Sequence, residues 1–432
     1  MIDLFKKEWL FYLVFLLLSL FLFFGMDLVP FHPDESTQIY MSQDLFDIFK
    51  DPLSLSYKPG TELSNEMTYR AIDMPLTRYL IGLARLITGT PNLASDWNWA
   101  LSWEQNKGAG AIPSSTLLTY ARFSPTFLLA ISLYLFYFSI RKILPKTSAL
   151  ISTLFLGLNP LILLHGRRAM SEPALLFGIT LFFWAVSRDR IKPFVVGIAL
   201  ALAFNAKQTG IFLVPVGIIA VCTLPDEENH LKDMLARSAG LLAVFLILTL
   251  LLNPYYWDSP FSALVAGYQS RSHLFNLQIA DHLPGGTPNF FSLILNLISN
   301  LFILPPAVSE ISKYLNPMAQ QIQVYKNILP HIWGRGLIVG SLQLAIFLSG
   351  FYVMKKRYPS QTKPTQQNLM LLLMSSLIMA IGILLALPIP WQRYIVPLLP
   401  LVAFWFGCGS LPFIEVLQAV ARNAKRRPGI PK

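Results

Sequence analysis

The chain has 432 residues, of which 54% are hydrophobic and only 13% are charged, and its mean hydropathy is +0.52. Soluble domains carry about 25% charged residues, so this composition excludes an ordinary soluble protein and predicts an all-α polytopic membrane protein. The net charge of +11 does not indicate nucleic acid, because much of the basic surplus flanks apolar segments, where it orients helices and contacts anionic lipids. Both cysteines, Cys222 and Cys408, lie in apolar segments, which favours buried thiols over a disulfide or a metal pair.

The first apolar segment, 9–29, is too long for the hydrophobic region of a signal peptide and predicts a membrane span. Two lysines precede it, so the positive-inside rule places the N-terminus in the cytoplasm and the end of the span outside. The polar loop that follows, 30–118, is therefore expected on the external face. It carries two apolar but charged stretches, 36–50 and 74–85, which we interpret as helices lying on the membrane surface.

Further apolar segments alternate with basic clusters, such as 141–146 and 355–357, that mark the cytoplasmic ends of spans. A second polar region, 254–335, is expected to form another external loop. Within it the apolar stretch 290–304 is interrupted by serine and asparagine, so we interpret it as a partly buried helix, and a span there stays open. One domain is expected over 1–432, with both termini in the cytoplasm and no separate soluble domain. About ten spans are expected, at 9–29, 119–140, 148–164, 173–186, 194–206, 210–224, 241–252, 337–354, 369–387 and 394–411.

The chain contains no glycine-rich phosphate-binding loop, no G-x-S-x-G sequence and no H-E-x-x-H sequence. No expected cytoplasmic segment is long enough to form a nucleotide-binding domain. The polar regions large enough to build a site are the two external loops, where nucleotide-activated substrates are not expected. An activated substrate on that side is expected to be lipid-linked and delivered through the bilayer.

Five basic residues fall at the expected external ends of spans, although the positive-inside rule disfavours them there. An anionic phosphate head group would explain this placement, because Arg and Lys bind phosphate through charge-assisted hydrogen bonds. Alternatively, each side chain reaches toward water from a helix end or pairs with a nearby acid. These residues are Arg122, Arg167, Arg168, Lys207 and Arg393.

Two adjacent carboxylates, Asp34 and Glu35, follow the first span at the external membrane surface. A carboxylate there would act as a general base or as a metal ligand. Alternatively, Asp34 caps a helix that begins at Ser36, since acids favour the first turn of a helix. The sequence Ser171-Glu172-Pro173 is likewise either an ordinary helix start or the source of a second carboxylate in the same cavity.

The sequence Trp391-Gln-Arg-Tyr394 opens the last expected span. An aromatic and basic entry of this kind is a common interfacial anchor, and it would equally place Arg393 as a clamp for a lipid phosphate. The histidines, among them His165, His273 and His331, are scattered without the spacing of metal ligands, so no histidine metal site is predicted.

The sequence His32-Pro-Asp-Glu35 resembles the acidic motif in the first external loop of the GT-C superfamily of membrane glycosyltransferases. Within that superfamily the chain is most similar to the dolichyl-phosphate-mannose protein mannosyltransferase and aminoarabinose transferase group, glycosyltransferase families 39 and 83. The order and topology of several short motifs carry the resemblance from the first span to the last. The other motifs are Met74-Pro-Leu-Thr-Arg-Tyr79, Ala121-Arg-Phe-Ser-Pro125, Arg168-Ala-Met-Ser-Glu-Pro173, Ala203-Phe-Asn-Ala-Lys-Gln208 and Arg393-Tyr-Ile-Val-Pro-Leu-Leu-Pro400.

The resemblance implies a GT-C-like fold and an enzyme that moves a sugar from a polyprenyl-phosphate donor to an acceptor hydroxyl, with inversion at the anomeric carbon. It implies Asp34 as the base that activates the acceptor, with Glu35 as its catalytic neighbour. The metal requirement differs within the superfamily, so Mg²⁺ or Mn²⁺ stays open as a cofactor. The implied phosphate-binding residues are Arg393, Lys207, Arg122 and Arg168, and the implied supporting residues are His32, Glu172 and Tyr394.

The implied partners are a polyprenyl-phosphate-linked sugar, membrane lipids and an acceptor, which stays open between protein, lipid A, another glycolipid and a cell-wall glycan. We expect a multi-pass protein of the plasma (inner) membrane with its active site on the external or periplasmic side. Two other functions stay open, namely a transporter or flippase of lipid-linked glycans and a ligase or polymerase of such glycans. The nearly uncharged spans and the lack of an internal repeat favour the enzyme over the transporter.

Overall fold

The computed structural model describes residues 2–223, 231–283, 288–309, 316–386, 389 and 391–426. The regular elements among these residues are all helical, and no strand occurs in this part of the chain, as the composition predicted. Some parts of the predicted elements lie outside the described residues. They are residue 224 of the sixth predicted span, residue 387 of the ninth, parts of the second external loop at 284–287 and 310–315, and the tail beyond 426.

Five helical segments in the described part of the chain are long and apolar enough to cross a membrane, and five further apolar helical segments are shorter, compared with about ten predicted spans. The five longer segments are α7 (Ser115–Ile140), α13 (Leu231–Leu252), α18 (Leu337–Arg357) continued by η6 (Tyr358–Ser360), α19 (Lys363–Ala386), and η7 (Gln392–Leu398) continued by α20 (Leu399–Arg426). The five shorter segments are most of α1 (Ile2–Phe24), α10 (Ser171–Val186), α11 (Pro193–Ala206), η2 (Gln208–Leu213) with α12 (Val214–Cys222), and α15 (Phe290–Ile298) with η4 (Ser299–Ile303).

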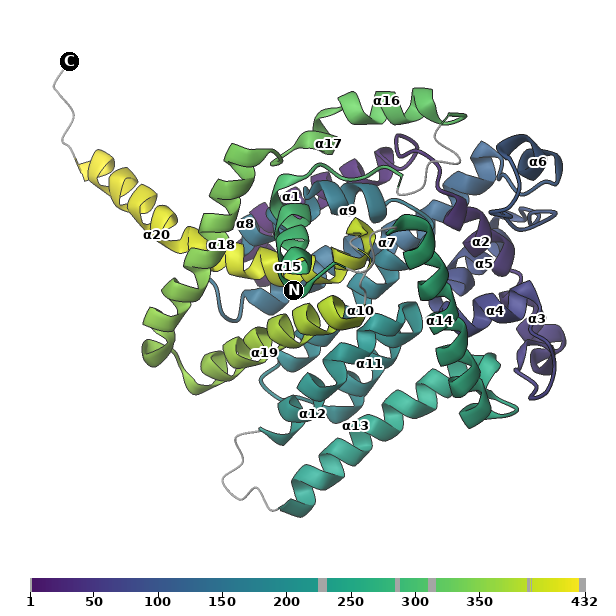
Figure 1. Ribbon diagram of the computed structural model, residues 1–432. Coiled ribbons are helices and arrows are strands. Elements are labelled where there is room, and N and C mark those ends of the chain that lie inside the picture. The colour runs from purple at the N-terminus through teal and green to yellow at the C-terminus, as the bar shows by residue number, and fades with distance from the viewer. Residues whose placement is uncertain are drawn as a thin grey trace.

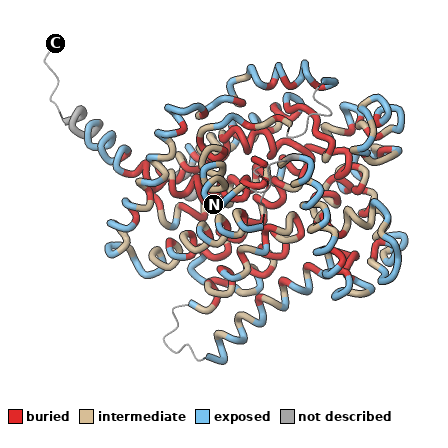
Figure 2. Tube along the Cα trace, viewed as in Figure 1, coloured by how far each residue is buried: buried red, intermediate tan, exposed pale blue. Residues whose placement is uncertain are grey.

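The outer helices expose apolar side chains, as a surrounding lipid requires. On α13, Leu246, Ile247 and Leu251 are each more than half exposed, and Figure 2 shows how little of this helix is buried. Soluble proteins rarely expose apolar surface over a whole helix, because that surface would contact water. In a bilayer the same surface contacts lipid chains, and the helix satisfies its own backbone hydrogen bonds.

Short helices pack together beside the end of α1, at the right of Figure 1. The predicted surface helix 36–50 was wrong in two respects. The chain forms two helices there because Ser42 and Gln43 make a turn, and the first helix is buried, with Ile39 packed against Ile81. The short helices of this region are α2 (Pro33–Met41), α3 (Asp44–Lys50), η1 (Pro52–Leu55), α4 (Asn65–Ile72), α5 (Leu76–Thr88) and α6 (Trp103–Gly108).

The predicted third span, 148–164, is not continuous. It is divided into α8 (Lys146–Gly157) and α9 (Pro160–His165), because Pro160 cannot continue the preceding helix and Asn159 caps the next one by accepting from the N–H of Leu161 at 3.0 Å.

The region expected as the second external loop contains a long helix that was not predicted, α14 (Pro260–His282). It also contains η3 (Pro254–Tyr256), α16 (Ala319–Asn327) and α17 (Leu329–Ile332). The stretch 290–304 is helical, as expected, and it is apolar but shorter than the five helical segments that are long enough to cross a membrane.

Close packing at the centre of the bundle depends on a glycine. The helix α10 lies against both α7 and α11. At Gly178 of α10 an added Cβ would lie only 2.5 Å from the Cα of Ala203 in α11, so the two backbones touch where both residues are small. Small residues at such crossings are the usual device for packing helices within a membrane.

We therefore expect Gly178→Ala to destabilise the protein by about 1–3 kcal/mol, because the new methyl group forces α10 and α11 apart. Gly240→Ala is the matched control, since an added Cβ at this position of α13 meets nothing within 4 Å. The control is expected to be neutral or slightly stabilising. Thermal unfolding of both purified variants in detergent checks this, and equal unfolding temperatures would contradict the packing described.

Candidate active site

The first turn of α2 holds the two adjacent carboxylates that follow the first span. Pro33 occupies the first helical position, and His32 is the N-cap. The Nδ1 atom of His32 accepts from the backbone N–H of Asp34 at 3.1 Å, and the backbone N–H of His32 donates to Oε2 of Glu35 at 3.0 Å. This reciprocal pattern is a capping box. The alternative in which Asp34 caps a helix from Ser36 is therefore wrong, because the cap is His32.

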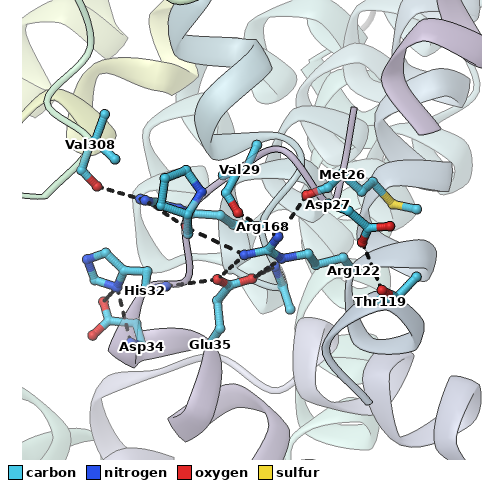
Figure 3. A network of polar contacts seen from close by, with 12 residues as sticks. Met26, Asp27, Val29, His32, Asp34, Glu35, Thr119, Arg122, Arg168 and Val308 are labelled. Atoms are coloured by element: carbon cyan, nitrogen blue, oxygen red, sulfur yellow. Dashed lines mark hydrogen bonds and ion pairs between the residues drawn. The ribbon is translucent and has the colours of Figure 1, made fainter. Parts of the chain in front are cut away.

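Glu35 is buried and forms an ion pair with Arg122 of α7 (Figure 3). The Nε and Nη2 atoms of Arg122 each donate to a different carboxylate oxygen at 2.7 Å. Its other donors reach the backbone carbonyls of Met26, Val29 and Pro30 at 2.7, 2.9 and 3.5 Å. All five N–H groups of the guanidinium are thus used within the protein. This network joins the end of the first span to the start of α7.

Glu35 is also held from the loop that precedes α10. The backbone N–H of Ala169 donates to Oε1 at 2.9 Å, and Arg168 adds a positive charge close by. Burial alone would raise the pKa of Glu35, but the charges of Arg122 and Arg168 and the hydrogen bonds outweigh it, so the pKa is lowered from its usual 4.5. Glu35 is therefore ionised at neutral pH, and with 0% exposure it contacts only protein groups.

Asp34 has different surroundings from its neighbour. Its side chain is 31% exposed, forms an ion pair with Arg393 through Oδ2, and lies 3.8 Å from Nδ1 of His32. Figure 3 shows Asp34 beside His32 and on the far side of Glu35 from Arg122. Glu35 is thus enclosed in a hydrogen-bond network, while Asp34 is partly accessible beside Arg393.

Two cations approach the same aromatic ring next to Asp34. Arg393 comes from η7, and its guanidinium carbon lies 5.4 Å from the ring centre of Tyr394. Lys207 is the C-cap of α11, and its Nζ lies 5.1 Å from the same ring. That Nζ also donates at 2.7 Å to Glu172, a buried acid in the first turn of α10. Cations over a tyrosine face are stabilised by its π electrons, which favours this joint placement.

The predicted site residues therefore form two neighbouring groups. Around Asp34 the chain gathers His32, Arg393, Tyr394, Lys207 and Glu172. Around Glu35 it gathers Arg122 and Arg168. The Nη2 atom of Arg168 donates to the backbone carbonyls of Pro30 and Val308 at 3.3 and 2.7 Å. Arg167 belongs to neither group, since its guanidinium lies over the ring of Phe21 at 4.7 Å. The chemical roles of these residues stay predictions.

Sequence reasoning missed Asp73 and Arg271. Asp73 is the C-cap of α4, and Arg271 of α14 lies 3.8 Å from it. Burial raises the pKa of Asp73 more than Arg271 lowers it, and the negative charge of nearby Asp34 adds to the rise. The sequence did offer a signal for Asp73, because this acid directly precedes the motif that starts at Met74. No comparable signal marked Arg271, since α14 itself was not predicted.

The residues around Asp34 do not form a metal-ligand set. In the described part of the chain, no three His, Cys, Asp or Glu side chains are grouped closely enough to hold a metal ion. The groups nearest Asp34 include the cations Arg393 and Lys207, which suit an anion better than a divalent cation.

The two carboxylates are expected to differ in their effect on stability. Glu35→Gln leaves Arg122 buried without its anionic partner, which costs about 3–5 kcal/mol. Asp34→Asn is the matched control in the same helix turn and should cost less than about 1 kcal/mol, since Asp34 is partly exposed. Thermal unfolding in detergent measures both, and equal losses would contradict the division of roles.

The contribution of Glu35 to stability is also expected to depend on pH. Because folding lowers the pKa of Glu35, its ion pair stabilises the fold above about pH 4.5, and this contribution is lost as the pH falls through the lowered value. The unfolding temperature of Glu35→Gln should therefore change less than that of the wild type on acidification. An identical acid dependence in both proteins would show that Glu35 is not the titrating group.

Residues 116–257 match the family model described as dolichyl-phosphate-mannose-protein mannosyltransferase. No curated protein sequence matches the chain. Among solved structures, the oligosaccharyltransferase of Archaeoglobus fulgidus is similar with a TM-score of 0.51 at 13% identity, over 99% of this chain and 53% of that one.

Two further solved structures are similar at lower scores. ArnT from Cupriavidus metallidurans, bound to undecaprenyl phosphate, has a TM-score of 0.47 at 13% identity, over 96% of this chain and 63% of that one. The S. cerevisiae protein O-mannosyltransferase Pmt1–Pmt2 complex, bound to the sugar donor, has a TM-score of 0.41 at 18% identity, over 59% of this chain and 34% of that one. The chain thus spans 34% to 63% of the lengths of these three proteins. These findings agree with the predicted resemblance to the GT-C membrane glycosyltransferases: residues 116–257 match the family model of the dolichyl-phosphate-mannose-protein mannosyltransferases, and the chain has the fold of the archaeal oligosaccharyltransferase.

Proposed function

We propose that this chain is an integral membrane glycosyltransferase that moves a sugar from a polyprenyl-phosphate donor to an acceptor hydroxyl, with inversion at the anomeric carbon. One observation carries the proposal: the partly exposed Asp34 contacts Arg393, and Lys207 approaches the same Tyr394 ring as Arg393. A partly exposed carboxylate and two cations therefore lie together, as a base and a phosphate site would require. The related family is named for transfer from a lipid-linked mannose to protein, which supports the same class of reaction here.

The two cations are proposed to bind the phosphate of the donor. Arg393 and Lys207 are 11% and 19% exposed, so a ligand can reach them, whereas Arg122 and Arg168 are almost fully buried. A small pocket beside Arg393 is lined mainly by apolar side chains of α15 and α19 together with Trp391 and Tyr394. At about 30 Å³ this pocket is too small to enclose an isoprenoid chain, so the two cations alone support the phosphate site.

The proposed reaction is a single displacement. The carboxylate of Asp34 takes the proton of the acceptor hydroxyl while that oxygen forms a bond to C1 of the donor sugar. The bond from C1 to the phosphate oxygen breaks, and its electron pair leaves with the polyprenyl phosphate. Arg393 and Lys207 stabilise the negative charge that develops on this leaving group. Attack opposite to the leaving group inverts C1.

Glu35 and Arg122 are proposed as positioning residues. Every donor of Arg122 is used within the protein, so a phosphate would have to displace an existing hydrogen bond to reach it. The ion pair instead fixes the first turn of α2 and with it the direction of Asp34. Glu172 is proposed to act in the same way on Lys207, which it holds at 2.7 Å.

We propose that this site faces the external or periplasmic side of the plasma (inner) membrane. Asp34 follows the end of α1, Lys207 ends α11, and Arg393 precedes α20. The basic clusters at 141–142 and 355–357 lie at the opposite ends of α7 and α18, and such clusters are typical of the cytoplasmic side. The same rule places both termini in the cytoplasm. The acceptor stays open between protein, glycolipid and glycan.

Asp34→Asn is expected to lower sugar transfer by about 10²–10⁴-fold, because general base catalysis is lost while folding is retained. Mass spectrometry of glycolipids and glycoproteins identifies the product that disappears in a deletion strain. Wild type and Asp51→Asn, an exposed control in the same region, should restore this product, whereas Asp34→Asn should not. Restoration by Asp34→Asn would exclude Asp34 as the base. A product that is merely relocated to the inner leaflet would favour the flippase.

Arg393→Gln is expected to reduce kcat/KM for the lipid-linked donor by roughly 10²–10³-fold, since the charge that stabilises the leaving phosphate is removed. Arg393→Lys should retain part of the activity, because the charge remains but the planar fork is lost. Steady-state kinetics with a polyprenyl-phosphate sugar measure both variants. If Arg393→Gln were no worse than Arg393→Lys, its charge would have no role in binding phosphate.

A further inference from the structure

A cavity of about 690 Å³ opens beside the Glu35–Arg122 pair. It lies between the end of the first span, the start of α7, the loop after α6, and α16. Arg122 forms part of its wall, but none of the residues grouped around Asp34 lines it. Figure 3 shows Asp27 and Thr119, two lining residues, on the side of Arg122 that faces away from Asp34. The cavity is therefore separate from the proposed transfer site.

The charges around this cavity disfavour a phosphate. Arg122 is its lining cation, and all five N–H groups of that side chain already donate to protein atoms. The lining also contains the exposed carboxylate of Asp27, which accepts from the hydroxyl of Thr119 at 2.8 Å. A carboxylate has about four acceptor positions, so most of those on Asp27 remain for a ligand. The cavity thus offers acceptors to a ligand rich in hydroxyl donors.

One wall of the cavity is aromatic and firmly held. Trp103 lines it from the start of α6, a helix with a capping box at Ser102. The indole packs edge-on against Phe31, with ring centres 6.1 Å apart, and against Trp97 at 5.8 Å. Trp103 keeps intermediate exposure in spite of these contacts. A fixed, accessible indole is a platform on which the C–H face of a sugar ring can stack, because the face of an aromatic ring carries partial negative charge.

Polar side chains form another part of the cavity lining. Ser115, Thr116 and Gln321 also line it and supply hydroxyl and amide groups. An acyl chain filling the cavity would bury these groups without hydrogen bonds, which is costly. The volume falls in the range of sites that enclose a small ligand.

We propose that this cavity is a second carbohydrate-binding site, which takes one or two uncharged sugar rings. One ring stacks on Trp103, and its hydroxyl groups donate to Asp27 and exchange hydrogen bonds with Gln321. The proposal concerns binding alone, so it stands whether or not Asp34 transfers sugar.

Saturation-transfer-difference NMR on the full chain in lipid nanodiscs tests this site. The probes are methyl α-mannoside, methyl β-galactoside and methyl β-N-acetylglucosaminide, with glucose 1-phosphate as an anionic comparison. At least one neutral probe should receive saturation on its ring C–H protons, and glucose 1-phosphate should bind more weakly. Trp103→Ala should raise the Kd of that probe roughly fivefold to tenfold, and Asp27→Asn about threefold to tenfold.

Two further variants separate binding from folding. Trp103→Phe keeps a stacking ring and should retain most of the affinity even if Trp103→Ala folds poorly. Trp257→Ala removes another exposed indole that does not line the cavity and should leave the Kd unchanged. The proposal is overturned if no neutral probe is saturated, if glucose 1-phosphate binds best, or if Trp103→Ala and Asp27→Asn both bind the probe like the wild type.

Discussion

The buried ion pair between Glu35 and Arg122 joins residues that are 87 positions apart in the chain. It connects the first turn of α2 with α7, while further bonds from Arg122 fix the end of the first span. Removing two such charges from water is costly, and the pair persists because every oxygen and N–H group has a partner. The direction of Asp34, one residue away, follows from this network. The rest of the proposed site depends on that direction.

Two neighbouring carboxylates therefore have unlike surroundings, and we propose different roles for them. Glu35 is ionised, buried and fully hydrogen-bonded, which suits it to hold backbone in place. Asp34 is partly exposed beside Arg393 and can meet an incoming hydroxyl. The contrast arises because adjacent residues on a helix point about 100° apart, so one turn can serve the interior and the cavity together. The two arginines differ in the same way, because Arg122 is buried in the ion pair with Glu35 and Arg393 is partly accessible beside Asp34.

The sequence was sufficient for the class of fold and for most helices, because twenty-residue apolar segments and basic clusters are strong local signals. It also singled out Asp34, Lys207 and Arg393 as candidates, because adjacent carboxylates follow the first span and the positive-inside rule disfavours basic residues at external span ends. It did not predict that Glu35 is enclosed by Arg122 and Ala169, because both residues are distant from it in the chain. The long helix α14 and the break at Asn159 were missed because weak amphipathic patterns and tertiary partners determine them.

The most direct test of this account is an experimental structure of the full chain with a polyprenyl phosphate bound. The phosphate is expected about 3 Å from the guanidinium of Arg393 and beside Asp34. The ion pair between Glu35 and Arg122 should be unchanged. A phosphate bound by Arg122, with that pair broken, would contradict the division of roles between the two carboxylates.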